Sequence, residues 1–478
     1  NLSLDGKGSY EQLLSQGNKF VDELFAQLKN RKIDQAVLRA KFPSMRMKLN
    51  AGRNNLFSRT LGWYGYTIKN AEIDLASSPK IGMGGHITID SLVAGGFLID
   101  TIRSRVLTIR DTTRYQILVA NNKHNPQYVF RSYTMGEVFE RGSNILTQLY
   151  DAKGRLGMKL GLVAVMEPNG SRVSLIDRNP VIGYKTFTAN ERNYIYLGSD
   201  QRVYADMVLA AEDGTGIQLY SDNDNTEALQ DLTLSLGKIE LGDVLSVIPY
   251  LPDITGTLDG DFHVIQTQDA FSLSSNFTVD EMTYEGARLG DVGSEFVYMP
   301  LADGTHTVDG ILMADGREVS TVTGSYLSEG DGYMDVTMSM ERMPLQFFNA
   351  FLPRKLLGLR GYGEGSLEVK GSMSQPEVNG EVFLDSGYVA SPTYGVQMRF
   401  ADDPVRIVNS HLLFENFEMY SDNGSPLIIA GELDFSNLDD MAMDIRMRAE
   451  NFQIINAKKS RYAEAYGKAF VNFTCLLY

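Results

Sequence analysis

The chain has 478 residues, of which 43% are hydrophobic and 22% are charged, the composition of a folded protein. Its 60 acidic residues outnumber its 44 lysines and arginines. The net charge of −16 argues against a nucleic-acid partner, because binding phosphates requires a surplus of positive charge. A single cysteine excludes an internal disulfide. The sequence has no run of about 18 apolar residues, so no helix that spans a bilayer is predicted.

The first 40 residues are the most helical part of the sequence. A further helical turn is expected from Asp34, and Pro43 ends the pattern. Because the polar side carries charges of both signs, we expect the helix to pack on a sheet edge rather than to lie on a membrane. Its apolar residues recur at intervals of three and four, which is typical of one helix face: Leu13, Leu14, Val21, Leu24, Phe25 and Leu28.

The two ends of the sequence suggest a piece of a longer protein. The chain starts without Met and without a basic segment followed by an apolar core, so no signal peptide is predicted. Its last residues, 470–478, look like a strand that is cut mid-course.

From Met45 the period of the pattern changes to two. Met45, Met47 and Leu49 alternate with charged residues, which predicts a strand with one face turned away from water. Comparable strands follow along residues 41–178.

Three features of this β-region bear on its organisation. A hairpin is expected around residues 168–170, where Pro, Asn and Gly stand together. The stretch 133–150 fits either a helix or a strand. We place a soft domain boundary near Arg178.

One pattern in the second half of the chain is used twice. Gly256 and Gly260 recur as Gly361 and Gly365, about 105 residues later, and each copy follows a short apolar segment that ends in proline. The pattern predicts an elongated protein built from β-repeats. The predicted parts are a helical segment (1–40), a β-region (41–178) and three β-repeats (179–241, 242–341 and 342–457). Residues 458–478 begin a truncated module that opens with a polar helical patch.

The sequence contains no recognisable catalytic or metal-binding pattern. None of its five histidines stands at metal-ligand spacing from another histidine or a cysteine. Residues 222–225 resemble the start of a calcium loop, but Glu227 and Thr233 occupy the positions that require glycine and glutamate. We therefore expect no enzymatic activity, no metal and no cofactor.

Alternation in the predicted strands concentrates apolar side chains on one face. An apolar sheet face must be covered, ordinarily by a second sheet or by helices. The repeats offer almost no helical cover, and the count of 20 methionines suits a surface that accepts varied apolar partners. A curled sheet lined in this way would hold acyl chains. The candidate lining residues are Leu232, Leu234, Leu236, Leu258, Phe262, Val264, Met334, Val336, Met338, Met340, Leu367, Val369, Leu427, Ile429, Leu433, Phe435, Met443, Ile445 and Met447.

The run 363–382 resembles the repeat signature of the TamB family, the translocation and assembly module proteins. It contains a glycine-bounded strand, a second glycine, Pro376 and another strand that opens at Gly380. The resemblance covers about 179–478 and is greatest to Bacteroidetes-type members. Earlier residues are closer to the broader AsmA-like group of bridge-like lipid-transfer proteins.

This resemblance implies an elongated, taco-shaped antiparallel β-sheet with an apolar interior, located in the periplasm. Family members are anchored by an N-terminal inner-membrane helix and engage an outer-membrane barrel of the TamA type. They are linked to phospholipid movement between membranes and to assembly of outer-membrane proteins. The sequence contains neither that anchor nor a complete C-terminal module. The family has no catalytic residues, so the resemblance assigns none to this sequence.

Three functions are compatible with these observations. The first is a non-enzymatic periplasmic bridge whose groove carries phospholipid acyl chains, with headgroups left in water along its rim. The second is a chaperone-like scaffold whose strand edges pair with unfolded outer-membrane segments. The third is a surface adhesin or carbohydrate-binding protein, which the single tryptophan, Trp63, disfavours.

Overall fold

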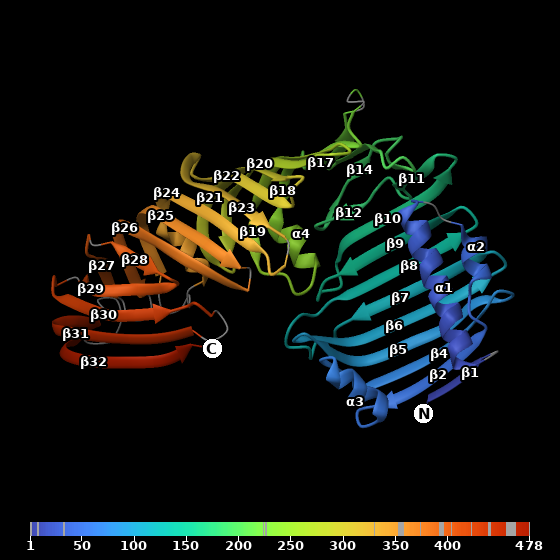
Figure 1. Ribbon diagram of the computed structural model, residues 1–478, viewed down its shortest axis with the longest axis horizontal. Helices are drawn as coiled ribbons and strands as arrows, with labels where there is room; N and C mark the ends of the chain where they lie inside the picture. Colours follow the sequence, from blue (N-terminus) through green and yellow to red (C-terminus); the bar gives the residue numbers. More distant parts are fainter. Residues whose placement is uncertain are drawn as a thin grey trace. The chain divides into compact units, whose positions relative to one another are not determined.

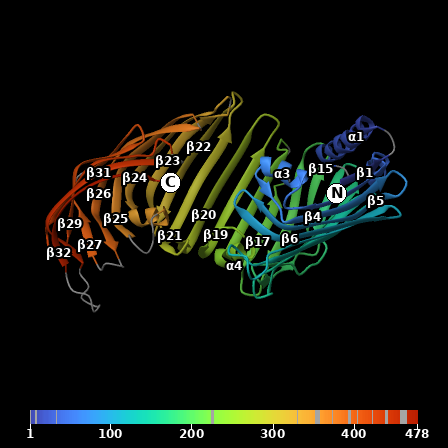
Figure 2. The same cartoon turned by 90° about the horizontal axis from the view of Figure 1, so that it is seen from below.

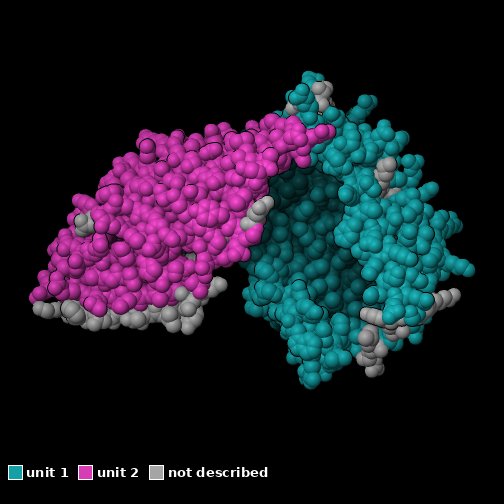
Figure 3. Space-filling view, in the orientation of Figure 1, with its two compact units in different colours: residues 1–253 teal, residues 254–478 magenta. Residues whose placement is uncertain are grey.

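The computed structural model divides into two compact units, Asn1–Asp253 (unit 1) and Ile254–Tyr478 (unit 2) (Figures 1 and 3). Each unit is mainly antiparallel β-sheet with few helices. Among the described residues, no helix is both long and apolar enough to cross a membrane. The structure describes residues 2–6, 9–31, 34–222, 224, 227–328, 330–351, 358–372, 374–391, 396–402, 404–421, 423–437, 441–455 and 465–477.

Unit 1 is built mainly from antiparallel strands. From β4 to β11, each strand pairs with the next strand along the chain. Its helices are α1 (Tyr10–Lys29), α2 (Gln35–Ala40), α3 (Leu56–Trp63) and α4 (Leu241–Val247). Its strands are β1 (Leu2–Gly6), β2 (Met45–Gly52), β3 (Tyr66–Thr67), β4 (Asn70–Ser78), β5 (Gly82–Ala94), β6 (Phe97–Ile109), β7 (Thr112–Ala120), β8 (Arg131–Phe139), β9 (Gly142–Tyr150), β10 (Leu156–Glu167), β11 (Gly170–Leu175), β12 (Val181–Ile182), β13 (Lys185–Thr186), β14 (Thr188–Ala189), β15 (Tyr194–Gly198), β16 (Val203–Ala210), β17 (Gly216–Ser221) and β18 (Gln230–Glu240).

Unit 2 is a second antiparallel succession, whose sheet is visibly curved in Figure 2. β26 pairs with both β27 and β28, and β29 then continues the sheet. Its elements are β19 (Ile254–Gln266), β20 (Phe271–Tyr284), β21 (Ala287–Pro300), β22 (Thr305–Ala314), β23 (Arg317–Leu327), β24 (Tyr333–Pro344), the 3-10 helix η1 (Leu345–Phe351), β25 (Gly358–Ser372), β26 (Gln375–Ser391), β27 (Val396–Phe400), β28 (Val405–Val408), β29 (His411–Ser421), β30 (Pro426–Asp434), β31 (Met441–Ile455) and β32 (Ala465–Leu477).

The predicted fold class, an antiparallel β-sheet with few short helices and an N-terminal helix, is confirmed. The stretch 133–150, which fitted either a helix or a strand, forms most of the hairpin β8–β9. The hairpin predicted around 168–170 is β10–β11. The contacts divide the chain after Asp253, and β10 and β12, which lie on the two sides of Arg178, pair with each other. Residues 458–464 of the predicted helical patch lie outside the described residues.

The repeated glycines have equivalent structural positions. The helix α4 precedes β19 in the chain as η1 precedes β25. Gly256 and Gly361 both lie where the register shifts, with φ of +130° and +101°. The opposing strand carries an extra residue at each shift, and there Glu281 and Ser386 adopt φ of +49° and +51°. The bulges therefore repeat with the same spacing as the glycines.

Substituting the bulge glycine is expected to destabilise unit 2. A Cβ atom at Gly361 would stand 2.6 Å from both the Ser386 carbonyl oxygen and the Gly387 Cα, in a backbone conformation that favours glycine. We expect Gly361→Ala to lower the free energy of unfolding by about 1–3 kcal/mol, measured by chemical denaturation. Gly358→Ala in the same strand is the control, because its Cβ would meet open space. Equal stability of the two variants would contradict this account.

The helices α1 and α2 lie across one end of the unit 1 strands (Figures 1 and 2). The Phe20 ring centroid of α1 lies 5.2 Å from that of Phe42. The Ser77 hydroxyl at the end of β4 donates to the Pro43 carbonyl at 2.6 Å, and the Gln35 amide donates to Thr113 at the start of β7 at 3.3 Å. The segment around α2 therefore packs across strand ends of the sheet. The apolar side predicted for α1 is not covered by the sheet, because Leu14, Val21, Leu24, Phe25 and Leu28 are all exposed.

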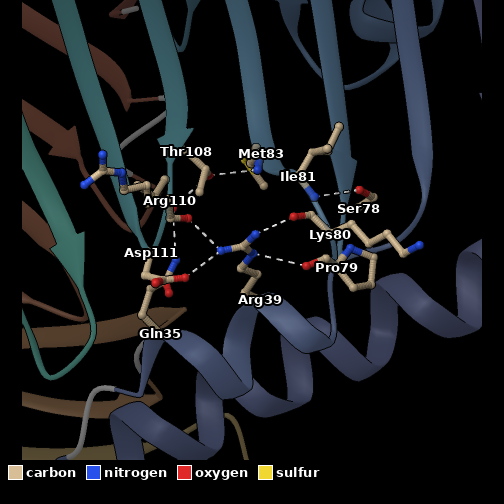
Figure 4. Close-up of polar contacts among 11 residues, drawn as sticks. Gln35, Arg39, Ser78, Pro79, Lys80, Ile81, Met83, Thr108, Arg110 and Asp111 are labelled. Carbon is tan, nitrogen blue, oxygen red and sulfur yellow. Dashed lines mark hydrogen bonds and ion pairs between the residues drawn. The ribbon is translucent and has the colours of Figure 1, made fainter.

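Arg39 of α2 joins two hairpin turns to this helical segment (Figure 4). Its guanidinium donates to the carbonyl oxygens of Pro79 at 3.1 Å, Arg110 at 2.6 Å and Lys80, and forms an ion pair with Asp111 at 2.9 Å. Asp111 is 83% exposed, so the ion pair contributes little. The bonds from a charged donor to backbone carbonyls are the stronger attachment.

We expect Arg39→Met to loosen this attachment without unfolding the sheet. Loss of the carbonyl bonds should cost about 2 kcal/mol locally, which corresponds to roughly a 30-fold increase in local opening. Hydrogen exchange of residues 10–40 measures this change, with β6–β9 as an internal reference. Lys41→Met, at an exposed position on the same segment, is the control. Unchanged exchange in Arg39→Met would disprove the attachment.

Candidate functional site

The strand register places the predicted lining residues of unit 2 on a single face of its sheet. Directly opposed residues of antiparallel strands point to the same side. Met338 of β24 lies opposite Val322 of β23 and Leu367 of β25. We call this side the apolar face; its predicted members are Leu258, Phe262, Val264, Met334, Val336, Met338, Met340, Leu367, Val369, Leu427, Ile429, Leu433, Met443, Ile445 and Met447. Phe435 follows β30 directly, and its backbone N–H donates to the Ser410 carbonyl at 3.1 Å.

Sequence reasoning named no lining residue in the strands between these members. The same pairing carries the apolar face through β20–β23, β26, β28 and β29, whose alternation is the signal that could have revealed them. Their large side chains on this face include Leu273, Phe277, Val279, Phe296, Tyr298, Val308, Leu312, Val322, Val378, Val382, Ile407, Leu412, Phe414, Phe417 and Met419.

The opposite face of unit 2, which we call the polar face, carries exposed ion pairs. It also exposes some apolar side chains, among them Val297, Met299, Phe383 and Val408. Lys370 lies 3.2 Å from Glu368 and 3.7 Å from Asp335, and the hydrogen bond to Glu368 together with both negative charges raises the pKa of Lys370. Arg406 lies between two carboxylates, 3.0 Å from Glu381 and 3.2 Å from Glu415. Such pairs add little stability in water.

The apolar face is sealed at one end and partly exposed elsewhere. η1 lies at the sealed end, where the buried Leu345 side chain would contact a Cβ added to Gly363 or Gly387, each at 3.4 Å. Val389, Phe417 and Met419 form a buried cluster on this face. Of the nineteen predicted lining residues, Met340 and Ile445 are buried, which leaves seventeen partly exposed. The described strands of unit 2 belong to one sheet.

The three leucines predicted in β18 belong to unit 1. Leu234 lies opposite Leu219, and Leu236 lies opposite Ile217. Leu232, Leu234 and Leu236 are only partly exposed. Ile217 packs against a buried cluster centred on Phe187. The predicted lining is therefore divided between two units.

Unit 1 has its own extended apolar face. Leu49 lies opposite Ile73, which lies opposite Ile87, and the face continues along the sheet. Its further members include Ile89, Ile102, Val106, Tyr115, Ile117, Val119, Ile145, Leu149, Leu160 and Leu162. Figure 3 shows the surface of unit 1 hollowed on the side that α1 borders in Figure 1.

The surroundings of Tyr115 illustrate how this face shields polar groups. Burial raises the pKa of the Tyr115 hydroxyl, which donates to the Asn144 carbonyl at 3.2 Å. Where β2 and β4 pair, Leu49, Ala51 and Ala71 are buried, and Phe57 of α3 packs against them.

The described residues contain no group of three or more His, Cys, Asp or Glu side chains that could hold a metal ion. Asp222 at the predicted turn accepts a hydrogen bond from the backbone N–H of Asp224 at 2.9 Å, as a polar turn does.

Comparisons with known proteins found no matching family model, no matching curated protein and no matching solved structure. The resemblance to the TamB family therefore stays an expectation from the sequence.

Cysteine accessibility tests whether the apolar face is open. Three neighbouring positions of β24 differ in exposure: Met340 is buried, Met338 is partly exposed, and Ser339 is exposed on the polar face. In a Cys475→Ser background stripped of lipid, we expect maleimide to label Ser339→Cys fastest, Met338→Cys at an intermediate rate and Met340→Cys slowest. Labelling of Met338→Cys as slow as that of Met340→Cys would mean that the face is closed.

Proposed function

We propose that this chain is a non-enzymatic lipid-binding protein whose apolar sheet faces hold phospholipid acyl chains. The observation that carries the proposal is the apolar face of unit 2, which extends from β19 to β31 and keeps most of its lining residues partly exposed. A surface of this size must be covered, and flexible apolar ligands fit its methionines, leucines and valines.

The energetics favour an acyl chain as this cover. Each buried methylene is worth about 0.8 kcal/mol, so about fifteen methylenes would gain roughly 12 kcal/mol if fully buried, and about half of that in a groove open on one side. Ordering the chain offsets part of this gain. Binding would then be firm enough to retain lipid and weak enough to allow movement along the face.

The cellular setting of the proposal follows from the sequence resemblance. It is a periplasmic bridge between inner and outer membranes that supports outer-membrane assembly. The full-length protein would be anchored in the inner membrane and would contact an outer-membrane barrel of the TamA type. The ion pairs on the opposite face suit a protein that stands in water.

A charge placed on the apolar face tests the proposal. Met338→Glu is expected to lower the amount of co-purifying lipid by about tenfold or more, because a carboxylate beside an acyl chain must be desolvated or protonated. Mass spectrometry of organic extracts measures the lipid, and circular dichroism reports on the fold. Thr337→Glu, the adjacent residue on the polar face, is the matched control. Unchanged lipid content in Met338→Glu would overturn the assignment of this face.

A further inference from the structure

A row of aromatic side chains borders the apolar face of unit 2 at one end of its strands. Tyr298 lies near the end of β21, His306 is the second residue of β22, and Tyr326 is the second-last residue of β23. Phe271 opens β20 beside them, with its ring centroid 6.3 Å from that of Tyr298. The register puts all four on the apolar face: His306 lies opposite Pro300 on one side and Tyr326 on the other.

His306 is the polar centre of this row. Its ring lies between two tyrosine rings, with centroid distances of 5.8 Å to Tyr298 and 5.7 Å to Tyr326. The Tyr298 hydroxyl lies 2.6 Å from His306 Nδ1. In the neutral imidazole, a hydroxyl that donates to Nδ1 leaves the proton on Nε2. With the Tyr298 hydroxyl as the donor to Nδ1, Nε2 carries the proton and can donate to a ligand.

Two polar groups on this row lack a protein partner. Within the part of the chain that the structure describes, neither His306 Nε2 nor the Tyr326 hydroxyl forms a hydrogen bond, and both residues are partly exposed. They belong to adjacent, directly opposed residues of β22 and β23. A phenylalanine would provide the ring packing equally well, so the packing alone does not account for polar atoms on an otherwise apolar surface.

We propose that His306 and Tyr326 bind the anionic polar end of an acyl-chain ligand, a phosphodiester or a carboxylate, while its hydrocarbon lies on the apolar face below. This inference rests on the proposed function and specifies which residues would bind the polar end of the ligand. Aromatic rings with one polar atom occur where hydrocarbon meets water, as at membrane interfaces. Tyr298 is a positioning residue, because its hydroxyl contacts His306 Nδ1 and its ring stacks on the imidazole.

The neighbouring apolar residues fit this orientation of the ligand. Val308, Leu312 and Val336 lie on the same face, further from the strand ends that carry His306 and Tyr326. A ligand held by its polar end at His306 would lay its chain across these residues towards Met338. The headgroup would then contact protein at this place, whereas the sequence alone suggested headgroups left in water.

Amphiphile binding to the full chain tests the proposal. Three ligands share one acyl length and differ in the polar end: a short-chain phospholipid below its micellar concentration, the matching fatty acid and the matching neutral monoacylglycerol. The variants are His306→Phe, Tyr326→Phe and their combination. Tyr333→Phe is the control, because Tyr333 stands at the same strand end on the polar face.

We expect the combined variant to lose about 10- to 100-fold in affinity for an anionic ligand, since each hydrogen bond to a charged group is worth roughly tenfold. Affinity for monoacylglycerol should change by less than about threefold, and Tyr333→Phe should behave as the native protein. His306→Gln, which keeps an N–H donor, should retain part of the anion preference.

Histidine-selective nitrogen NMR provides an independent readout, because the chain has only five histidines. The resonance missing from His306→Phe is that of His306, and it should shift with the anionic ligands. A shift with the phospholipid alone identifies a phosphodiester, and a shift with the fatty acid alone identifies a carboxylate.

Two results would overturn the inference while leaving acyl-chain binding intact. One is an equal loss of affinity for the neutral and the anionic ligands, which would mean that the rings contribute only packing. The other is unchanged affinity for all three. If the native protein binds none of the three ligands, the proposed function fails together with this inference.

Discussion

The register of the antiparallel strands is the constraint on which the rest of the structure depends. Side chains alternate along a strand, so a slip of one residue would move a whole row from one face to the other. Met338 stays opposite Val322 and Leu367 only because each strand keeps its register with both neighbours. The bulges beside Gly256 and Gly361 take up extra residues in a left-handed conformation. These glycine positions and the apolar face are therefore parts of the same arrangement.

Much of the fold was predictable because alternation is a local property of the sequence. The strands β2, β18, β24 and β31 follow directly from period-two patterns, and the glycine repeat indicated equivalent bulges. The stretch 133–150 was ambiguous for a physical reason. Met135 is exposed and apolar on one face, and Ile145 is exposed and apolar on the other, so the alternation that identifies a half-buried strand is blurred.

The parts that could not be predicted depend on contacts between distant residues. Arg39 binds carbonyls 40 to 71 positions away, and no local pattern indicates such partners. The same holds for the division after Asp253, which follows from the contacts within each unit. For the candidate site, the sequence identified strands with an apolar side, and only the pairing established that β20–β23 join them on the same side. His306 and Tyr326 lie on the two strands of one hairpin and become neighbours through its register.

The distribution of cover over the apolar face argues for an external ligand. If the chain were selected only to close this surface, the simplest means would be more elements such as η1, which seals one end with Leu345. Most of the lining residues that were predicted in unit 2 instead remain partly exposed, although an exposed apolar surface favours aggregation. The polarity also changes across the face, from Met338 and Met340 towards Tyr298, His306 and Tyr326 at the strand ends. A ligand that is apolar along its length and polar at one end would match both properties.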